Sequence, residues 1–260
     1  PRRRPESRHP MTTIADINRR RGWIVVATCF VAMAFTFGAR SSISMVLPLW
    51  RDELGWSSTQ SSTGASLVLV MMALGSPVAG YLMDRFGARR VIGCGLTALA
   101  IGVGGTAYAT EPLHYYLLFG IIGGAGYASV SIPLVTAAVS SYFVRSRGLA
   151  IGIGIAGASG GQLPVLSMLG VMIAALGWRQ SYQILGVVLA VLAVFILLRL
   201  KPPLHDDAAV TSRTEAPEND TLADRLRFLF ANRTFLLLFG AFTLCGFTTA
   251  GVIDVYFIPY

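Results

Sequence analysis

The feature that most constrains this chain is a series of continuous apolar blocks, each about twenty residues long or longer. A helix of that length crosses the roughly 30 Å hydrocarbon core of a lipid bilayer. Because the bilayer core offers no water to backbone N–H and C=O groups, a spanning segment must be a helix or part of a closed barrel. The apolar residues are continuous rather than alternating, which favours helices over strands. The sequence therefore predicts an all-α membrane protein.

The order of the blocks predicts six membrane-spanning helices followed by the beginning of a seventh. The six helices are expected at about 22–49, 59–83, 90–110, 113–140, 148–175 and 180–200, and the seventh apolar block is 234–260. Two prolines, Pro202 and Pro203, end the sixth helix because proline cannot continue it. The predicted regions are a basic N-terminus (1–21), a six-helix bundle (22–200), a polar central loop (201–232) and the start of a second bundle (233–260). Since no polar segment follows the seventh block, we expect the chain to be a fragment that ends at or inside that helix.

Charge is scarce in this chain, and its placement predicts how the helices are oriented. Only 13% of the residues are charged, whereas 54% are hydrophobic. Of the 21 basic residues, eighteen lie in the N-terminus and in the even-numbered loops, on one side of the predicted helices. Cytoplasmic loops are enriched in Lys and Arg, so we expect the N-terminus and the central loop in the cytoplasm of a multi-pass cell-membrane protein. The net charge of +8 thus reflects membrane topology, and no nucleic-acid partner is expected.

The sequence predicts no metal site, no cofactor and no catalytic residue. The three cysteines, Cys29, Cys94 and Cys245, lie inside apolar blocks without the spacing of metal ligands. The sequence contains no recognisable nucleophile–base pair or phosphate-binding loop. An enzyme is therefore not expected, and membrane lipid is the partner expected of the apolar helices.

The most specific motif lies between the second and third predicted helices and reads GYLMDRFGARR, residues 80–90. Its glycines permit close backbone approach and a tight turn, and Asp84 can pair with an arginine or with the N-terminal end of a helix. One interpretation is an ordinary positively charged cytoplasmic loop. The spacing and position also resemble the cytoplasmic loop signature of the major facilitator superfamily. That resemblance implies a cytoplasmic gate latch, formed by Gly80, Asp84, Arg85, Gly87, Arg89 and Arg90.

A second resemblance covers residues 142–161, at the start of the fifth predicted helix, which read YFVRSRGLAIGIGIAGASGG. This segment is similar to the corresponding segment of monocarboxylate transporters and oxalate–formate antiporters. Glycines four residues apart let helices approach closely. Such glycines are explained by packing alone or by a segment that bends, and both interpretations stay open. The residues of this predicted packing motif are Tyr142, Phe143, Arg147, Gly152, Gly157 and Gly161.

Arg40 is a cation inside the first apolar block, and it is the strongest functional candidate. It follows Trp23 by seventeen residues, which is about 26 Å along a helix. Thr36, Arg40 and Ser44 recur every four residues and predict a polar stripe on the first helix. A charged residue within a membrane helix marks a functional site, and a guanidinium binds carboxylate through two parallel hydrogen bonds. The alternative is an arginine whose side chain reaches the outer headgroups.

Three further polar residues lie inside predicted helices. Asp254, in the seventh block, is interpreted either as a salt-bridge partner or proton site facing Arg40, or as an acid at the outer interface. Tyr127 and Gln162 lie near the middle of the fourth and fifth helices, where each contacts either the substrate or a neighbouring helix. The predicted substrate-binding residues are therefore Arg40, Ser44, Tyr127 and Gln162.

Together these resemblances imply a fold and a function. The fold is the six-helix N-terminal bundle of the major facilitator fold plus a seventh transmembrane helix. The function is secondary active transport of a small organic anion, a monocarboxylate, by alternating access, as proton symport or anion exchange. The partners are then a small carboxylate anion, a proton in the symport case, and the C-terminal half that completes the pathway. The alternative is a non-transporting truncated fragment or a helper membrane subunit of such a carrier.

Overall fold

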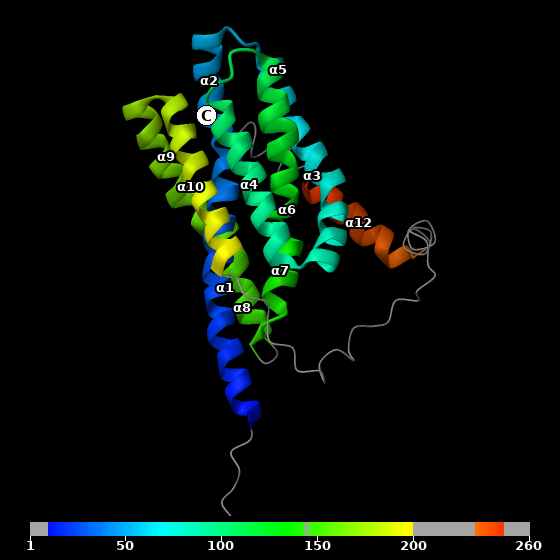
Figure 1. Ribbon diagram of the computed structural model, residues 1–260. Coiled ribbons are helices and arrows are strands. Elements are labelled where there is room, and N and C mark those ends of the chain that lie inside the picture. The colour runs from blue at the N-terminus through cyan, green and yellow to red at the C-terminus, as the bar shows by residue number, and fades with distance from the viewer. Residues whose placement is uncertain (1–9, 144–145, 200–231, 247–260) are drawn as a thin grey trace, which may run out of the picture. The chain divides into compact units, whose positions relative to one another are not determined.

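The structure of the protein is a computed structural model that describes residues 10–143, 146–199 and 232–246, with side chains from residue 21 onward. The chain forms two compact units, Pro1–Leu204 and His205–Tyr260. The first unit is a bundle of helices (Figure 1). In chain order these are α1 (Pro10–Ser41), α2 (Ile43–Leu54), α3 (Ser58–Phe86), α4 (Ala88–Thr106), α5 (Pro112–Tyr115), the π-helical segment η1 (Tyr116–Gly123), α6 (Gly124–Ser129), α7 (Ile132–Ser140), α8 (Arg147–Ala156), the π-helical segment η2 (Gly157–Gly161), α9 (Gln162–Leu176) and α10 (Trp178–Arg199). In the second unit, α12 (Arg233–Gly246) covers part of the predicted seventh block.

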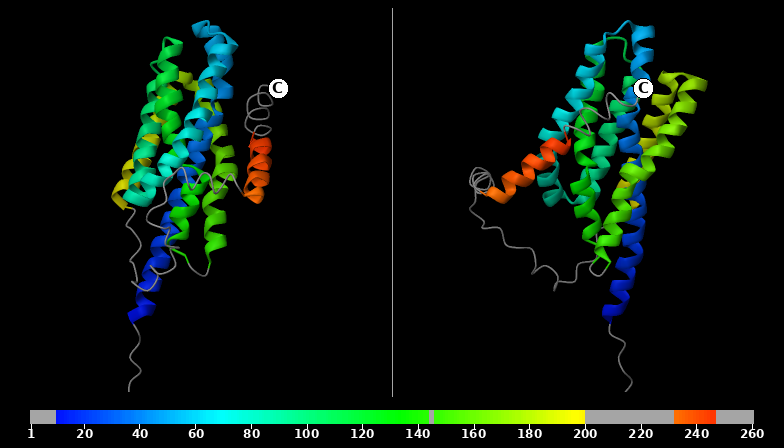
Figure 2. Two further views of the ribbon diagram at one scale, coloured as in Figure 1. Left: turned by 90° about the vertical axis from the view of Figure 1, so that its right-hand side faces the viewer. Right: turned by 180° about the vertical axis from the view of Figure 1, so that it is seen from behind.

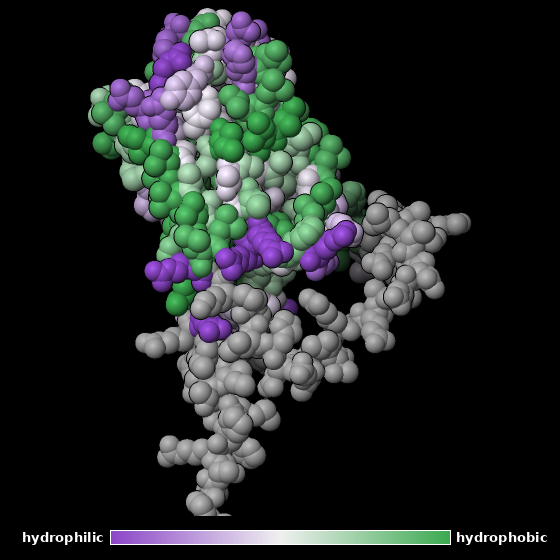
Figure 3. Space-filling model, viewed as in Figure 1, coloured by the Kyte–Doolittle hydropathy of each residue, from purple (hydrophilic) through white to green (hydrophobic). Residues whose placement is uncertain are grey.

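Five segments of the described chain are long and apolar enough to cross a membrane: Arg21–Leu54, Ser58–Phe86, Pro112–Ser140, Arg147–Leu176 and Trp178–Arg199. α4 adds a helix of 19 residues, whose two initial arginines and many glycines lower its hydropathy. On the face seen in Figure 3, apolar side chains cover the middle of the helices and hydrophilic ones gather toward their ends. The predicted all-α membrane fold is therefore confirmed.

Glycine and capping residues set the helix ends between these segments. Gly55 ends α2 in the left-handed conformation, with a φ of 67°. Ser57 and Gln60 form a capping box at the start of α3, in which the Gln60 N–H donates to Ser57 Oγ at 3.2 Å. Gly87 and Gly177, with φ of 83° and 81°, separate α3 from α4 and α9 from α10. The connections are short, so successive helices return along the bundle (Figure 2).

The first helix extends beyond its predicted bounds of 22–49. α1 begins at Pro10, and the helix continues through an irregularity at Ser42 into α2, which ends at Leu54. The Ser42 hydroxyl donates to the Ala39 carbonyl at 2.8 Å, a side-chain bond that competes with regular backbone hydrogen bonding. Pro48 lies inside α2 and lacks the N–H that would bond to the preceding turn. These two residues account for an irregular first helix.

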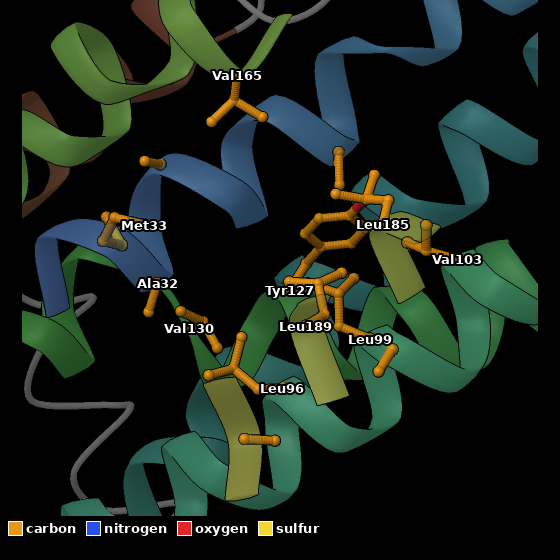
Figure 4. Packing of buried hydrophobic residues seen from close by; sticks show 14 of the residues in the cluster. Ala32, Met33, Leu96, Leu99, Val103, Tyr127, Val130, Val165, Leu185 and Leu189 are labelled. Carbon is orange, nitrogen blue, oxygen red and sulfur yellow. The ribbon is translucent and has the colours of Figure 1, made fainter. Parts of the chain in front are cut away.

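The core lies where α4 packs against α10 and α6, and where both α4 and α10 meet α1. Within a membrane, such packing is stabilised by van der Waals contact rather than by the hydrophobic effect. Figure 4 shows its fully buried side chains, which include Met33 from α1, Leu96, Leu99 and Val103 from α4, Tyr127 from α6, and Leu185 and Leu189 from α10.

Candidate functional site

Arg40 lies in the last turn of α1, immediately before the irregularity at Ser42. Its side chain is half-buried, and its guanidinium carbon lies 5.4 Å from the centre of the Phe37 ring. A cation over an aromatic face is stabilised by the negative face of the ring. Arg40 also lies inside the candidate membrane span Arg21–Leu54, well away from either end of that segment.

Polar side chains from α9 and α10 meet the first helix at this irregularity. Gln162 Nε2 donates to Ser41 Oγ at 2.7 Å, and the Tyr182 hydroxyl lies 3.0 Å from Ser42 Oγ. Ser44 Oγ donates to the Ser41 carbonyl at 2.8 Å. Gln162 thus joins two helices, and Ser44 bonds within its own helix. In this structure, both predicted substrate-binding residues make structural hydrogen bonds beside Arg40.

Tyr127 is held differently. It is 1% exposed, and its hydroxyl has no hydrogen-bond partner among the described residues. Figure 4 shows the Tyr127 ring among Leu99, Leu185 and Leu189. A buried hydroxyl without a partner loses free energy relative to water, so this group is available to a ligand or a bound water.

The loop between α3 and α4 contains the predicted gate residues. Asp84 is exposed in the last turn of α3 and makes no ion pair with any described residue. Arg85 lies with its guanidinium carbon 5.6 Å from the Phe86 ring centre and donates to the Tyr81 hydroxyl at 3.5 Å. Among the described residues, the acid of the motif is therefore not paired with the arginine next to it.

The remaining gate residues are Arg89, Arg90 and the two glycines, Gly80 and Gly87. Arg89 donates to the carbonyl oxygen of Leu197 and so connects the start of α4 to the end of α10. Arg90 is exposed. A Cβ added at Gly80 or Gly87 would meet no heavy atom within 4 Å. Within the described chain, the two glycine positions of this loop are therefore not covered by a neighbouring helix.

The glycines of the fifth helix do not share one packing face. A Cβ at Gly157 would lie 2.2 Å from the Phe30 carbonyl oxygen, and one at Gly161 would lie 2.5 Å from Ala34 Cβ. Both glycines therefore allow η2 to approach α1 closely. A Cβ at Gly152 would meet nothing within 4 Å. The step from 152 to 157 is five residues, so Gly152 and Gly157 fall on different faces of the helix.

The residues before these glycines contact the N-terminal part of α1. Phe143 is 5% exposed and packs edge-to-face on Trp23, with ring centres 5.5 Å apart. Tyr142 is half-buried, and a Cβ at Gly22 would lie 3.1 Å from its Cβ. Arg147 is exposed at the first position of α8. The predicted motif thus contacts the first helix through its aromatic residues and its last two glycines.

A polar cluster at the opposite end of the bundle was not anticipated from the sequence. Trp178 Nε1 donates to Glu53 Oε2 at 2.6 Å, and Arg179 Nε lies 3.3 Å from Glu53 Oε1. Arg179 also donates to the carbonyl oxygens of Ala107 and Ala109, at 2.9 Å and 3.4 Å. The cluster joins the end of α2, the start of α10 and the loop after α4. Few charged residues lie in the odd-numbered loops, and Glu53 and Arg179 are two of them. Their scarcity was the one indication in the sequence that they could pair.

Aromatic rings continue this cluster into the bundle. The Trp50 ring centre lies 5.3 Å from Trp56, 4.7 Å from Tyr115 and 5.7 Å from Trp178. Offset and edge-to-face aromatic pairs at such distances add stabilisation beyond area burial. We refer to Glu53, Arg179 and these four aromatic residues as the terminal clamp. It joins α2, α5, α10 and the loop after α4 at one end of the bundle.

Asp254 lies outside the described residues, so its relation to Arg40 stays a prediction. Among the residues that the structure describes, no group of three or more His, Cys, Asp or Glu side chains is arranged to hold a metal ion.

The family model of the Major Facilitator Superfamily matches residues 29–260. The chain belongs to this superfamily, a family of transporters rather than enzymes. The resemblance seen in the loop between the second and third helices is therefore confirmed at the level of the superfamily.

Individual relatives lie in the same class. Monocarboxylate transporter 11 of Mus musculus is 31% identical over 241 residues, which cover 92% of this chain and 50% of that protein. The human protein of the same name is 30% identical over 239 residues, covering 92% of this chain and 48% of the relative. An uncharacterized MFS-type transporter, YcxA of Bacillus subtilis (strain 168), is 25% identical over 244 residues and 58% of its length. The chain spans about half the length of the curated relatives it matches.

Proposed function

We propose that this chain provides the first bundle of a secondary active transporter that moves a small organic anion, a monocarboxylate, by alternating access. The observation that supports it most directly is Arg40, a half-buried cation within a membrane span. A fixed guanidinium offers two parallel N–H donors that match the two oxygens of a carboxylate. The Tyr127 hydroxyl, which is buried in the same bundle without a partner among the described residues, is a candidate donor of a further hydrogen bond to that anion. Relatives named monocarboxylate transporters support the same substrate class.

Gating and orientation complete the proposal. The N-terminus (1–21) and the central loop (201–232) lie in the cytoplasm, so the Asp84 loop lies on the cytoplasmic side. Its exposed Asp84 and Arg90, together with the open Gly80, suit a latch onto a second bundle that begins at 233–260. Arg40 cannot be the proton site, because guanidinium does not deprotonate in proteins. Asp254 is the candidate for a proton site or a salt-bridge partner if the carrier is a symporter.

Uptake of labelled lactate, pyruvate, formate and oxalate by the full-length protein in proteoliposomes tests the proposal. Losing a hydrogen-bonded pair with a charged group costs about 1.5–3 kcal/mol, so Arg40→Ala should lower uptake at limiting substrate roughly tenfold or more. Arg40→Lys should restore part of it, because ammonium keeps the charge but not the forked geometry. Arg51→Ala, at the exposed end of the same helix, is the matched control and should transport like the wild type.

Two outcomes of this assay are informative beyond the mutants. Acceleration by an inward proton gradient indicates symport, whereas dependence on internal unlabelled carboxylate indicates exchange. Carboxylate uptake that is unchanged in Arg40→Ala would show that Arg40 does not bind the substrate.

A further inference from the structure

The fourth membrane span is interrupted inside the bilayer region. Within Pro112–Ser140, α6 ends at Ser129 and α7 begins at Ile132. Between them Val130 has a non-helical backbone, with φ of −116° and ψ of 46°, and Ser131 is extended, with φ of −92° and ψ of 159°. The break lies nine residues before Ser140, or about 14 Å along a helix. A helix N-terminus is therefore present inside a span.

The first turn of α7 offers hydrogen-bond donors that have no acceptor within their own helix. The leading N–H groups of any helix have no partner in their own helix, and here Pro133 supplies none of its own. The N–H groups of Ile132 and Leu134 remain. No acidic residue occurs in this turn, so the partial positive charge of the helix end is not compensated by its own sequence.

Ser131 is a second and independent indication of a ligand. It precedes the first residue of α7, where serine normally accepts a hydrogen bond from the backbone, yet its side chain makes no such bond. It is 7% exposed, and its Oγ has no hydrogen-bond partner among the described residues. Buried hydroxyls in native proteins are generally satisfied by protein, water or ligand. Ser131 follows Tyr127 by four residues, and the Tyr127 hydroxyl is also buried and without a described partner.

We infer that the Ser131 hydroxyl and the first-turn N–H groups of α7 bind the carboxylate of the transported anion at a second station, about one helical turn from Tyr127 toward the end of the span at Ser140. Hydroxyl and amide donors at a helix N-terminus bind carboxylate without a fixed charge. An anion leaving the fixed charge of Arg40 would meet donors that hold it more weakly, which favours its release. With the orientation proposed above, this is the cytoplasmic side. The inference rests on the proposed function, since it assigns a further subsite for the same substrate.

The test uses full-length protein, with uptake measured in proteoliposomes and carboxylate binding measured as the rise in Tm on adding lactate, pyruvate, formate or oxalate. Ser131→Ala should raise the half-saturating carboxylate concentration roughly five- to tenfold and reduce the ligand-induced rise in Tm. Its Tm without ligand should stay near the wild-type value, because the side chain makes no capping bond that alanine would remove. Ser131→Thr keeps the hydroxyl and should behave like the wild type.

Two further variants separate this role from a structural one. Ser129→Ala is the matched control, because the Ser129 hydroxyl already donates to the Ala125 carbonyl at 3.0 Å, and it should leave uptake unchanged. Ser131→Asp places a permanent carboxylate at the N-terminus of α7, so it should preserve or raise Tm while abolishing carboxylate uptake. If Ser131→Ala matches Ser129→Ala in both measurements, the second station is overturned and the proposed function stands. If the wild type neither takes up nor is stabilised by any of the four anions, both are overturned.

Discussion

Replacing Gly157 with alanine is expected to destabilise the bundle, whereas the same change at Gly152 is not. A Cβ at Gly157 would lie 2.2 Å from the Phe30 carbonyl oxygen and 2.9 Å from the Phe30 Cα. An ordinary van der Waals separation is about 3.5 Å, so η2 and α1 would have to separate by roughly 1 Å. The obstructing atoms belong to backbone, which cannot rotate aside as the end of a side chain can. Overpacking of this kind costs about 1–3 kcal/mol.

Gly152→Ala is the matched control because both substitutions gain the same helix propensity, about 0.5–1 kcal/mol. No heavy atom lies within 4 Å of a Cβ at Gly152, so the difference between the two variants isolates the contact with Phe30. Thermal unfolding of the purified full-length protein, followed by tryptophan fluorescence, should place the Tm of Gly157→Ala several degrees below that of Gly152→Ala. Equal Tm values would refute the close contact between η2 and α1 and the argument drawn from it.

Two more substitutions test the ends of the bundle. Gly87 has φ of 83° and ψ of 153°, a region open essentially to glycine alone, so Gly87→Ala should cost about 1–3 kcal/mol and lower Tm. Gly80→Ala, which meets no atom within 4 Å, should not lower it. Glu53→Gln keeps an acceptor for the Trp178 N–H but loses the ion pair with Arg179. In that pair the Arg179 side chain is 36% exposed and the Glu53 side chain is 50% exposed. The substitution should therefore cost less than about 1 kcal/mol, an effect that disappears in high salt, whereas a larger loss would contradict a solvent-screened pair.

The membrane fold was predictable because its signal is local and repeated. Each apolar block is long enough to cross a bilayer, and glycine or proline residues lie at the helix ends. The first helix was predicted less well because its irregularity at Ser42 results from a side-chain bond to Ala39 within a continuous apolar block. The break at Ser131 was missed for a similar reason. Ser131 lies two residues before Pro133, and because proline is tolerated within membrane helices, the sequence did not distinguish a break from a kinked continuous helix.

The candidate site was predictable only where one residue is unusual by itself. Arg40 is recognisable as a cation inside an apolar block, independently of any partner. The terminal clamp is different, because Trp178 and Glu53 are separated by 125 positions in sequence and only the fold brings them together. For Gln162, the sequence indicated a functional position but not the partner of the side chain. Its polarity indicated a role in the membrane, but the choice between substrate and neighbouring helix depended on the position of Ser41.

The contact between the first and fifth helices connects the packing glycines to the candidate site. Phe30 meets Gly157, Ala34 meets Gly161, and a Cβ at Gly38 would lie 2.5 Å from Val165 Cγ1. These contacts advance by four residues on each helix, so they form one continuous line along both. Gln162, which follows Gly161 directly, adds a hydrogen bond to Ser41, the neighbour of Arg40. Because a helix in contact along such a line cannot rotate about its axis without losing every contact, the fifth helix fixes the direction in which the Arg40 side chain leaves α1. A substitution that separates these helices should therefore impair anion binding even though none of the glycines touches the anion.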